Sequence, residues 1–585
     1  MSPETSTQPA ASAARDPKTA DSLVLSLVGS GGDGVVLFGD LVLRMAARQG
    51  LYGMLVHSYG PQIKGGESAV TLHLAREEVR YEGDACDVLL CFRTRDLKRF
   101  SSALRLQPDC LVILDAADDG DLPEAIGSTR RPVYRYPFAT IQDGVEVEGE
   151  PKNMLGLGLL TRALGWPLEL ARQALEERFA QRPKNVARNL PAVEKGYATQ
   201  DAPALPRLKG HGRPLLIESG NEALARGAMD AGLKFFAGYP ITPSCELLET
   251  LIHELPSAGG KLVQAEDEIA AMGMVIGASY GGQLAMSATS GPGLSLMTEM
   301  IGLSSMAEVP TVVVDCQRAG PATGIPSRTE QADLLHAIYS GHGDQVRVVL
   351  GVYDVVHARE AMLKAFHLSE KYQLPVIVLA DAYISQRRQA RDPVVPPKEK
   401  PRRRVWEAGD SPQRFDPGDP CGVVPFHLPG TPGGQYIAAG IEHTPEGYPS
   451  ADTANHQQMN AKRFRKLAAA AEETRSWYRT LGQPGARRGI ITWGSQYGVV
   501  QRWVQDHPEY RAFLPEILYP FPLEAFETWR KGLEWSATLD LSYQGQFHRY
   551  LSGLTDMKGV RSLGRSGGVP LSTRELAQML AEASK

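Results

Sequence analysis

Short apolar runs alternate with amphipathic stretches along most of the chain. Leu23–Val28 (LVLSLV) has the continuous apolar character of a buried strand, and the stretch after Gly34 has the spacing of a helix. The alternation recurs from Leu215 to Ile384, and later in strands predicted at 488–495, 516–522 and 536–543 with a last helix at Thr573–Ala583. This order of elements predicts a multidomain α/β protein with parallel sheets, because parallel strands need helical crossovers.

Shifts in composition divide the chain into six segments. A tail rich in Ala, Ser, Thr and Pro is predicted to be disordered, and a polar linker joins the first two α/β domains. A connection rich in Pro and Arg precedes the third. The predicted boundaries are 1–22 for the tail, 23–195 for the first domain, 196–213 for the linker, 214–386 for the second domain, 387–480 for the arm and its connecting helix, and 481–585 for the third domain.

Local signals predict details within these segments. Asn221 is a candidate N-cap for the helix that runs to Ala231. Arg387–Asp419 is expected to be irregular, with the basic run Arg402–Arg404 on a solvated face or at an inter-subunit contact. A connecting helix is predicted at Asn460–Leu481.

Charge and composition exclude several classes of function. The 585 residues carry a net charge of −5, which gives no indication of a surface for nucleic acid. No apolar run approaches the roughly 20 residues that a membrane-spanning helix needs. The N-terminal segment lacks the apolar core of a secretory signal. The six cysteines include no CxxC pair and suit neither a zinc site nor an iron–sulfur cluster, so we expect a cytoplasmic protein with reduced thiols and no metal site of its own.

A glycine-rich turn, Gly29–Gly34 (GSGGDG), follows the first predicted strand and precedes a helix. Such a corner attracts anions, and its spacing fits the dinucleotide fingerprint. The fingerprint needs an acidic residue at the end of the second strand, where His57 and Ser58 stand instead, and this disfavours a nicotinamide cofactor. A phosphate site and a purely structural turn both remain open. Lys64, which precedes two glycines, is either a cation that binds a ligand or a solvated side chain.

Three motifs in the middle of the chain place polar residues at predicted strand ends. They are GYPITPS at 238–244, EDEIAAMGMVIGAS at 266–279, and TSGPGLSLM at 289–297, the last continuing through a β-branched strand towards a long Gly- and Pro-rich loop. In a parallel sheet these strand ends meet in one crevice, where ligands bind. The crevice would carry a hydroxyl, a carboxylate and a guanidinium, from Thr242, Glu268 and Arg318.

These three groups suit the decarboxylation of a 2-oxo acid. Thiamine diphosphate takes up the electrons that this reaction releases, and a carboxylate against its aminopyrimidine ring promotes the loss of the C2 proton. The substrate also needs a donor at its oxo group and a cation at its carboxylate. The neighbouring acids Glu266 and Asp267 are interpreted as charges that favour a helix N-terminus.

The motifs resemble those of a known family. YPITP, the EDEIAAMGMVIGAS and TSGPGLSLM runs, and VVVDCQRAGPATGIPSRTEQADL are similar to the α subunit of 2-oxoacid:ferredoxin oxidoreductases, most of all the 2-oxoglutarate enzymes. GSGGDGV and SYGPQIKGGE resemble the family's γ domain, here fused ahead of α, and SYQGQ at 542–546 lies in a unit that resembles a transketolase C-terminal domain. The resemblance implies a γ-type α/β domain, a thiamine-pyrimidine-binding parallel-sheet domain and a transketolase C-terminal-like α/β domain.

The resemblance also implies roles for individual residues. Glu268 would activate the thiamine pyrimidine, Thr242 would meet the substrate oxo group, and Arg318 would hold the substrate carboxylate. Arg328 is a second candidate for the carboxylate, and Lys64 would face substrate or coenzyme A. The other cofactor contacts implied are Tyr239, Pro240, Ile241 and Gly291.

The family's GDG…N motif for diphosphate and Mg²⁺ and its cluster cysteines are absent from the sequence. Both belong to the family's β subunit, so the resemblance implies a site shared between α and β, with Mg²⁺ and a [4Fe-4S] cluster on β, in an (αβ)₂ assembly. The implied reaction converts a 2-oxo acid, coenzyme A and oxidised ferredoxin to acyl-CoA, CO₂ and reduced ferredoxin, and it runs backwards with a strong reductant. 2-Oxoglutarate is the predicted substrate. Pyruvate or branched 2-oxo acids, an NAD-dependent dehydrogenase and a non-catalytic scaffold are the alternatives.

Overall fold

The computed structural model divides into two compact units. The first comprises residues up to 53, 58–78 and 85–215, and the second comprises 54–57, 79–84 and 216–585. The structure describes residues 20–59, 67–101, 104–138, 141–142, 145–146 and 151–585. Lys64 and most of the predicted N-terminal tail lie outside the described residues.

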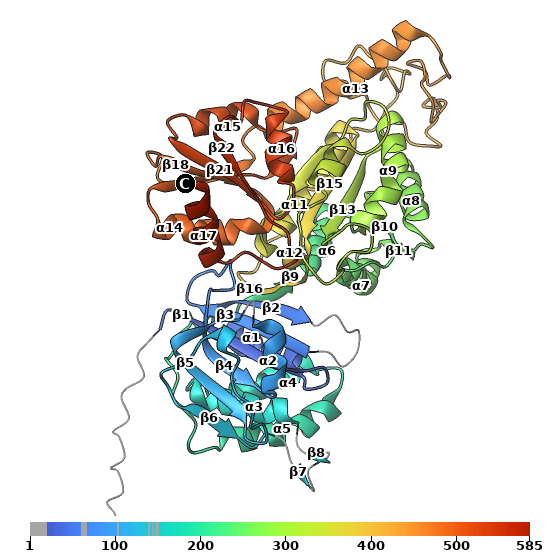
Figure 1. Cartoon of the computed structure of the whole chain (residues 1–585). Coiled ribbons are helices and arrows are strands. Elements are labelled where there is room, and N and C mark those ends of the chain that lie inside the picture. Colours follow the sequence, from blue (N-terminus) through green and yellow to red (C-terminus); the bar gives the residue numbers. More distant parts are fainter. Residues whose placement is uncertain (1–19, 60–66, 102–103, 139–140, 143–144, 147–150) are drawn as a thin grey trace, which may run out of the picture. The chain divides into compact units, whose positions relative to one another are not determined.

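The first unit is built on a mostly parallel sheet (Figure 1). Its order includes β6-β5-β4-β1-β3, in which β1 is antiparallel to β3 and the other pairs are parallel. The strands are β1 (Ser22–Ser30), β2 (Tyr52–Tyr59), β3 (Glu67–Ala75), β4 (Cys86–Cys91), β5 (Leu106–Asp115), β6 (Val133–Tyr136), β7 (Ile141–Gln142) and β8 (Val145–Glu146). The helices are α1 (Val35–Arg48), α2 (Thr94–Phe100), α3 (Lys152–Ala163), α4 (Leu168–Arg178) and α5 (Pro183–Tyr197).

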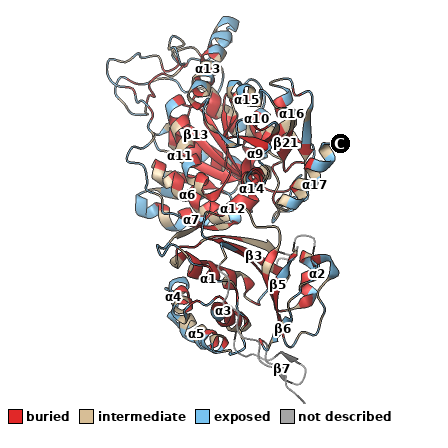
Figure 2. Ribbon diagram, turned by 90° about the vertical axis from the view of Figure 1, so that its left-hand side faces the viewer, coloured by how far each residue is buried: buried red, intermediate tan, exposed pale blue. Residues whose placement is uncertain are grey.

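The second unit contains a seven-stranded sheet in the order β11-β10-β12-β13-β15-β14-β20. Six of its strands are parallel, and β20 is antiparallel to β14. Residues of β13 alternate between two apolar clusters, with Val312 and Val314 in one and Val313 in the other. The sheet is therefore buried on both faces, as the red strands in Figure 2 show. This arrangement confirms the predicted α/β class.

From its start to the arm's helix, the second unit contains β9 (Leu216–Ser219), α6 (Gly220–Ala231), β10 (Phe235–Gly238), α7 (Cys245–Glu254), β11 (Lys261–Gln264), α8 (Glu268–Tyr280), β12 (Ala285–Thr289), α9 (Gly291–Met306), β13 (Thr311–Gln317), α10 (Leu334–Tyr339), β14 (Val348–Gly351), α11 (Val355–Tyr372), β15 (Pro375–Asp381), α12 (Ala382–Gln386), β16 (Arg388–Arg391) and α13 (Thr453–Thr474). Of these strands, β9 and β16 pair with each other and are not part of the seven-stranded sheet.

A five-stranded sheet follows in the order β17-β19-β18-β21-β22, with β17 antiparallel and the rest parallel. Trp493, Phe513 and Tyr550 from this region share one apolar cluster with Leu294 and Val313, so the two sheets of the second unit have a common core. The elements of residues 478–583 are β17 (Tyr478–Gly482), β18 (Arg488–Thr492), α14 (Tyr497–Asp506), β19 (Tyr510–Pro515), β20 (Ile517–Tyr519), α15 (Leu523–Arg530), β21 (Trp535–Asp540), α16 (Gln546–Ser552), β22 (Val560–Gly564) and α17 (Thr573–Ala583), of which β20 belongs to the seven-stranded sheet.

The prediction that Asn221 caps α6 is wrong. Ser219 is the N-cap and forms a capping box with Glu222, each side chain bonded to the other's backbone N–H. Asn221 lies within the helix, where its Nδ2 donates a hydrogen bond of 2.9 Å to the carbonyl oxygen of Pro243. The amide therefore holds the GYPITPS loop rather than the helix end.

The arm also differs from its prediction in three places. Its first residues form β16, which pairs with β9, so that part is not irregular. Arg403 is buried and donates to Glu370 at 2.6 and 2.8 Å, so the prediction of a solvated or inter-subunit basic run is wrong at this residue. The connecting helix α13 begins seven residues earlier than predicted because Asp452 caps it, and the last predicted residues form β17. Together with the segment before it, α13 projects from the rest of this unit (orange in Figure 1).

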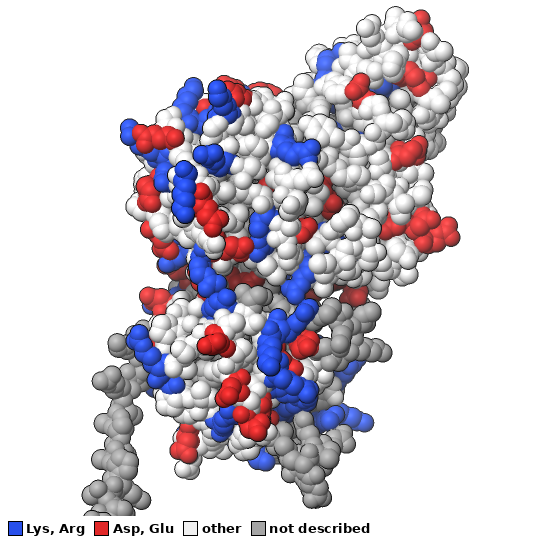
Figure 3. All heavy atoms as spheres, in the orientation of Figure 1, with Lys and Arg blue, Asp and Glu red and all other residues white. Residues whose placement is uncertain are grey.

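Charged side chains of both signs are distributed over the face shown in Figure 3. In the part of the chain that the structure describes, no helix is both long and apolar enough to cross a membrane. Nor do three His, Cys, Asp or Glu side chains come together there in a way that could hold a metal ion.

Candidate active site

Four loops meet at one edge of the seven-stranded sheet. They follow the carboxyl ends of β10, β11, β12 and β13, which are neighbours in the order β11-β10-β12-β13. The chain places β11 on one side of β10 and β12 on the other, so the strand order reverses at this point. Open parallel sheets bind ligands at such a reversal. The loops bring Thr242, Glu268, Gly291 and Arg318 to one edge, as the sequence predicts.

Arg318 and Thr242 are in direct contact. Nη1 of Arg318 donates a hydrogen bond of 2.8 Å to the backbone carbonyl oxygen of Thr242. Arg318 is only 7% exposed, and its Nε has no hydrogen-bond partner among the described residues. Burial lowers the pKa of Arg318, and the charge of Asp333 opposes that shift. The guanidinium is thus anchored at one nitrogen and retains capacity to bind an anion.

The three adjacent acids before and at the start of α8 have different surroundings. Glu266 is exposed, and Asp267 caps the helix by accepting a hydrogen bond of 2.7 Å from Ala270. Glu268 is 5% exposed, and no described residue donates a hydrogen bond to its carboxylate. A Cβ added to Gly293 would lie 2.4 Å from Oε1 of Glu268, so glycine is needed where α9 passes this carboxylate. Glu268 therefore has acceptor capacity that the described residues leave unused.

Two further carboxylates, Asp315 and Asp333, lie next to this edge. Asp315 is fully buried in β13, on the same side of the strand as Gln317, whose Oε1 accepts 3.1 Å from the backbone N–H of Asp333. A Cβ added to Gly291 would lie 2.7 Å from Oδ2 of Asp333, which places this carboxylate at the N-terminus of α9. Among the described residues, no hydrogen-bond partner reaches either oxygen of Asp315 or Oδ2 of Asp333.

These carboxylates have shifted pKa values. Burial raises the pKa of Asp333 to about 6, with Glu330 adding to the shift and Arg318 opposing it. Burial and the charge of Asp333 raise the pKa of Asp315 well above its usual range. Two carboxyls close together resist ionising at the same time. Of the two, the fully buried Asp315 resists ionisation more strongly than the half-buried Asp333.

The remaining predicted residues are placed as follows. Tyr239 and Pro240 are exposed and Ile241 is half-buried, on the loop that Asn221 holds. The backbone of Arg328 bonds to Ala319 at 2.9 Å, next to Arg318, while its side-chain stem lies against Gly568. The backbone of Arg328 therefore lies beside the crevice, whereas the stem of its side chain packs against Gly568. Lys64 lies outside the described residues.

In the glycine turn of the first unit, the side chain of Asp33 folds back onto the backbone of the turn. Oδ2 of Asp33 accepts 2.7 Å from the backbone N–H of Ser30, and Oδ1 lies 2.9 Å from Nζ of Lys152. A Cβ added to Gly29 would lie 2.9 Å from the same Oδ2, which explains the glycine. A carboxylate in this place competes with an incoming phosphate for the turn's donors. The contacts favour the structural interpretation of the turn.

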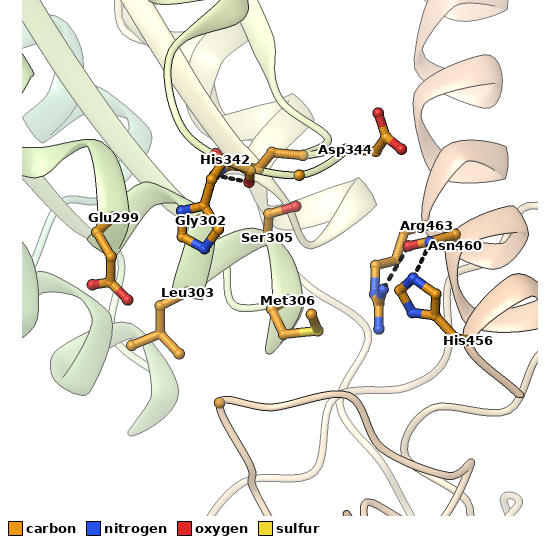
Figure 4. A pocket seen from close by; sticks show the side chains of 13 residues that line it. Glu299, Gly302, Leu303, Ser305, Met306, His342, Asp344, His456, Asn460 and Arg463 are labelled. Atoms are coloured by element: carbon orange, nitrogen blue, oxygen red, sulfur yellow. Dashed lines mark hydrogen bonds between the residues drawn. The ribbon is translucent and has the colours of Figure 1, made fainter. Parts of the chain in front are cut away.

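A pocket of about 270 Å³ lies elsewhere in the second unit, between the end of α9 and α13 (Figure 4). His342, Asp344 and His456 line it together with Arg463. Arg463 donates to Glu442, at 3.3 Å from Nη1 and also from Nη2, and to Asn460 at 3.0 Å, so its charge is already matched. None of the predicted site residues lines this pocket, and it is not the candidate site.

Two protein-family models match the chain. The model described as pyruvate flavodoxin/ferredoxin oxidoreductase, thiamine diphosphate-binding, matches residues 226–463, which contain the crevice. The model described as pyruvate ferredoxin/flavodoxin oxidoreductase matches residues 24–199.

The chain is also similar in sequence to named proteins over most of its length. The α subunit of 2-oxoacid:ferredoxin oxidoreductase 2 from Aeropyrum pernix is 32% identical over 468 residues, which cover 73% of this chain and 70% of that protein. The 2-oxoglutarate oxidoreductase subunit KorA of Mycobacterium tuberculosis is 31% identical over 532 residues, covering 83% and 80%. The chain belongs to the 2-oxoacid:ferredoxin oxidoreductase α-subunit family. It is part of an oxidoreductase with a thiamine-diphosphate-binding domain.

A solved structure aligns with almost the whole chain. The 2-oxoglutarate:ferredoxin oxidoreductase of Magnetococcus marinus, described with 2-oxoglutarate, coenzyme A and succinyl-CoA bound, aligns with a TM-score of 0.86 and 32% identity. The alignment covers 97% of this chain and 100% of that one. The family resemblance and the multidomain α/β class predicted from the sequence are confirmed.

Sequence reasoning missed the Asp315–Asp333 pair. A signal for Asp315 exists, because it is an acid directly after VVV in a strand whose every residue is buried. Asp333 sits in QADL within a long loop, and its position beside Gly291 depends on tertiary structure that no local pattern indicates.

Proposed function

We propose that this chain is the α subunit, with a fused γ domain, of an enzyme that oxidatively decarboxylates 2-oxoglutarate. The products are succinyl-CoA, CO₂ and reduced ferredoxin, and the reaction can run towards CO₂ fixation with a strong reductant. One observation carries the proposal: the unengaged carboxylate of Glu268 and the singly anchored guanidinium of Arg318 belong to loops at one sheet edge.

The residues present fit the pyrimidine end of thiamine diphosphate. When bound, this cofactor supplies an electron sink for decarboxylation. Glu268 would accept a hydrogen bond from the aminopyrimidine ring and promote its imino form, because its carboxylate has no competing donor among the described residues. Tyr239, Pro240 and Ile241 would contact the ring, and Gly291 and Gly293 keep α9 clear of it.

The same crevice can orient a 2-oxo acid. Arg318 would bind its 1-carboxylate through the nitrogens that Thr242 does not occupy, and a charged hydrogen bond of this kind also fixes the direction of the carboxylate. The exposed Thr242 hydroxyl would donate to the oxo group. Arg328, whose backbone carbonyl accepts from the N–H of Ala319, is the second candidate for the substrate carboxylate.

A β subunit would complete the site. Helix α8 has the sequence EIAAMGMVIGASY, yet Ile269 and Met274 are substantially exposed, and a Cβ on Gly277 would meet nothing within 4 Å. A helix that is apolar all round is normally buried. Other exposed apolar residues are Tyr239 and Ile325, on loops that follow β10 and β13, and Leu296 in α9. We infer that this face receives the β subunit, which brings Mg²⁺, the diphosphate site and a [4Fe-4S] cluster in an (αβ)₂ assembly that transfers electrons to ferredoxin.

Substrate choice is tested by a panel of 2-oxo acids. The relatives named for 2-oxoglutarate, and the Magnetococcus marinus structure described with it, favour 2-oxoglutarate over pyruvate. The co-purified αβ complex, supplied with coenzyme A and methyl viologen, should reduce viologen fastest with 2-oxoglutarate. A pyruvate or branched-chain rate far above that with 2-oxoglutarate would overturn the assignment.

The role of Glu268 is tested by Glu268→Gln in the same complex. Losing the carboxylate that activates the cofactor should reduce turnover by about 100- to 1,000-fold, the scale of removing one group placed for the transition state. Glu266→Gln is the matched control, since it alters an exposed acid two residues away. Wild-type turnover by Glu268→Gln would remove the proposed role.

The NAD-dependent alternative has less support. The turn Gly29–Gly34 would have to hold a pyrophosphate, but Asp33 already accepts from Ser30 within it and is paired with Lys152. Unchanged NADH fluorescence on titration with the complex is the expected result.

A further inference from the structure

We propose that Asp333 is the internal counter-ion of Arg318 in the ligand-free crevice, and that the Asp315–Asp333 pair takes up one proton when a 2-oxo acid binds. The inference rests on the proposed function, because it takes Arg318 as the residue that receives the substrate carboxylate. Both aspartates would be positioning residues, since they act through Arg318.

The first step concerns geometry. Arg318 follows β13 directly, and Asp315 is three residues before it, on the side of the strand where Gln317 holds the backbone of Asp333. Asp333 is the N-cap residue of α10, but its side chain makes no cap hydrogen bond. Its carboxylate is instead directed to Gly291, at the N-terminus of the sixteen-residue helix α9. The N-terminus of a helix favours a negative charge, so Asp333 is the member of the pair that ionises.

The second step concerns the charges around Asp333. The side chain of Arg318 donates its hydrogen bond to the Thr242 carbonyl oxygen, so Asp333 acts on Arg318 as a nearby charge and not as a hydrogen-bonded partner. Gln546 contributes only neutral contacts to this segment, accepting from Leu335 and donating to Ala332. The charged or titratable groups nearby come from four places. They are Asp315 and Arg318 from the β13 segment, Arg328 and Glu330 from the loop, His336 in α10 and Glu268 at Gly293 of α9, with Asp381 contacted by Gln331 at 3.3 Å.

The third step is the effect of a bound anion. Without substrate, one guanidinium faces one ionised carboxylate, and the second carboxyl of the pair is neutral. A substrate carboxylate on Arg318 adds a second negative charge beside Asp333 in a buried place, which disfavours the ionised form of Asp333. One proton then moves from solvent to Asp333, so binding and protonation are linked. When the substrate carboxylate leaves as neutral CO₂, Asp333 releases that proton to solvent.

The test is the pH dependence of the KM for 2-oxoglutarate in the αβ complex, measured by viologen reduction with saturating coenzyme A. Both substrate carboxyls stay ionised from pH 6 to 8. Because the ionised form of Asp333 predominates above about pH 6, the wild-type KM should rise between pH 6 and 8. Uptake of one proton permits a rise of up to about tenfold per pH unit.

Substitutions distinguish a positioning role of Asp333 from a purely structural one. Asp333→Asn removes the competing charge, so its KM should be nearly independent of pH and roughly tenfold below wild type at pH 8, the effect of about one pKa unit of coupling. A structural defect would raise KM instead. Asp315→Asn keeps one titrating carboxyl and should retain the wild-type slope. Asp344→Asn, an exposed acid away from the crevice, is the control and should change neither value.

A second readout does not depend on turnover. Calorimetric titration with N-oxalylglycine, an amide analogue of 2-oxoglutarate, in two buffers of different ionisation enthalpy counts the protons taken up. At pH 6.5, midway between a free pKa of about 6 and a bound pKa about one unit higher, uptake should be about half a proton for wild type and close to zero for Asp333→Asn. Two results would overturn this inference and leave the proposed function intact. One is a wild-type complex that turns over 2-oxoglutarate with a KM independent of pH, and the other is analogue binding without proton uptake. A complex that neither binds the analogue nor turns over any 2-oxo acid contradicts the proposed function and this inference with it.

Discussion

Two groups of buried charges in the second unit, the arm anchor and the crevice, differ in how their carboxylates are partnered. In the arm anchor, Glu308 follows α9 and accepts 2.6 Å from Nζ of Lys462 at each oxygen, with Lys466 and Arg414 beside it. All four side chains are buried. Although burial alone would raise the pKa of Glu308, the three cations hold it well below its usual range.

In the crevice the balance is reversed. Asp315 and Asp333 have buried oxygens that no described residue partners, and the pKa of Asp333 is raised to about 6 by burial first and Glu330 second. A buried oxygen without a hydrogen-bond partner lowers the stability of the fold. In the arm anchor this cost is avoided, because three cations surround one carboxylate. The comparison shows that burial of charge does not by itself indicate function. What distinguishes the candidate site is bonding capacity left unused.

The largest expected effect is on the arm anchor. Glu308→Gln leaves three cations buried around a neutral side chain, and breaking a buried ion pair in this way costs about 3–5 kcal/mol of stability. The thermal unfolding midpoint and soluble yield of the complex should both fall. A combined variant with Lys462→Met should recover part of the loss, because it removes one unpaired cation. An unchanged midpoint in Glu308→Gln would show that the anchor contributes little.

The next effect should appear in activity and not in stability. Arg318→Gln removes the cation proposed for the substrate carboxylate, so kcat/KM for 2-oxoglutarate should fall by roughly 100-fold, the equivalent of one charged hydrogen bond. The unfolding midpoint should stay close to wild type, since Arg318 makes a single hydrogen bond to Thr242. Arg404→Gln, an exposed arginine that pairs with Asp410, is the control. If Arg318→Gln lowered the unfolding midpoint and left kcat/KM unchanged, Arg318 would have a structural role like that of the arm anchor and would not bind substrate.

The smallest effect is a gain in stability. The folded-state pKa of Asp333, about 6, lies above its ordinary value, so the folded protein binds more protons between the two pKa values and loses stability as pH rises through that window. Asp333→Asn should therefore raise the unfolding midpoint at pH 8 by roughly 2–4 °C, and by less at pH 5.5 where Asp333 is mostly protonated. Differential scanning fluorimetry at both pH values measures this. A lower midpoint at pH 8 would contradict it.

Much of the sheet architecture and the crevice could be predicted, because both depend on local patterns. The valines before Asp315 predict a buried strand, and GYPITPS, with a proline on each side of Ile241–Thr242, predicts a loop at a strand end. Parallel topology then brings Thr242, Glu268 and Arg318 to one edge without further information.

What could not be predicted depends on partners distant in the sequence. The basic run around Arg403 predicts a solvated side chain. Its burial depends on the hydrogen bond to Glu370, 33 positions away, which no local pattern indicates. Ser219 and Asn221 are equally good caps by type, and the capping box with Glu222 decides between them. The Asp315–Asp333 pair depends in the same way on a backbone contact through Gln317.

The antiparallel strand β20 has a consequence for dividing the protein into pieces. It supplies the edge of the sheet that carries the crevice, with Gly351 donating 2.8 Å to the Glu516 carbonyl and Leu350 opposite Ile517. A chain cut after Pro515 would leave β14 as a bare edge with unpaired backbone groups, which invites association between copies. Comparing the aggregation state of the truncated chain with that of the full-length chain would show whether the sheet that carries the crevice stays free of self-association without residues 516–585.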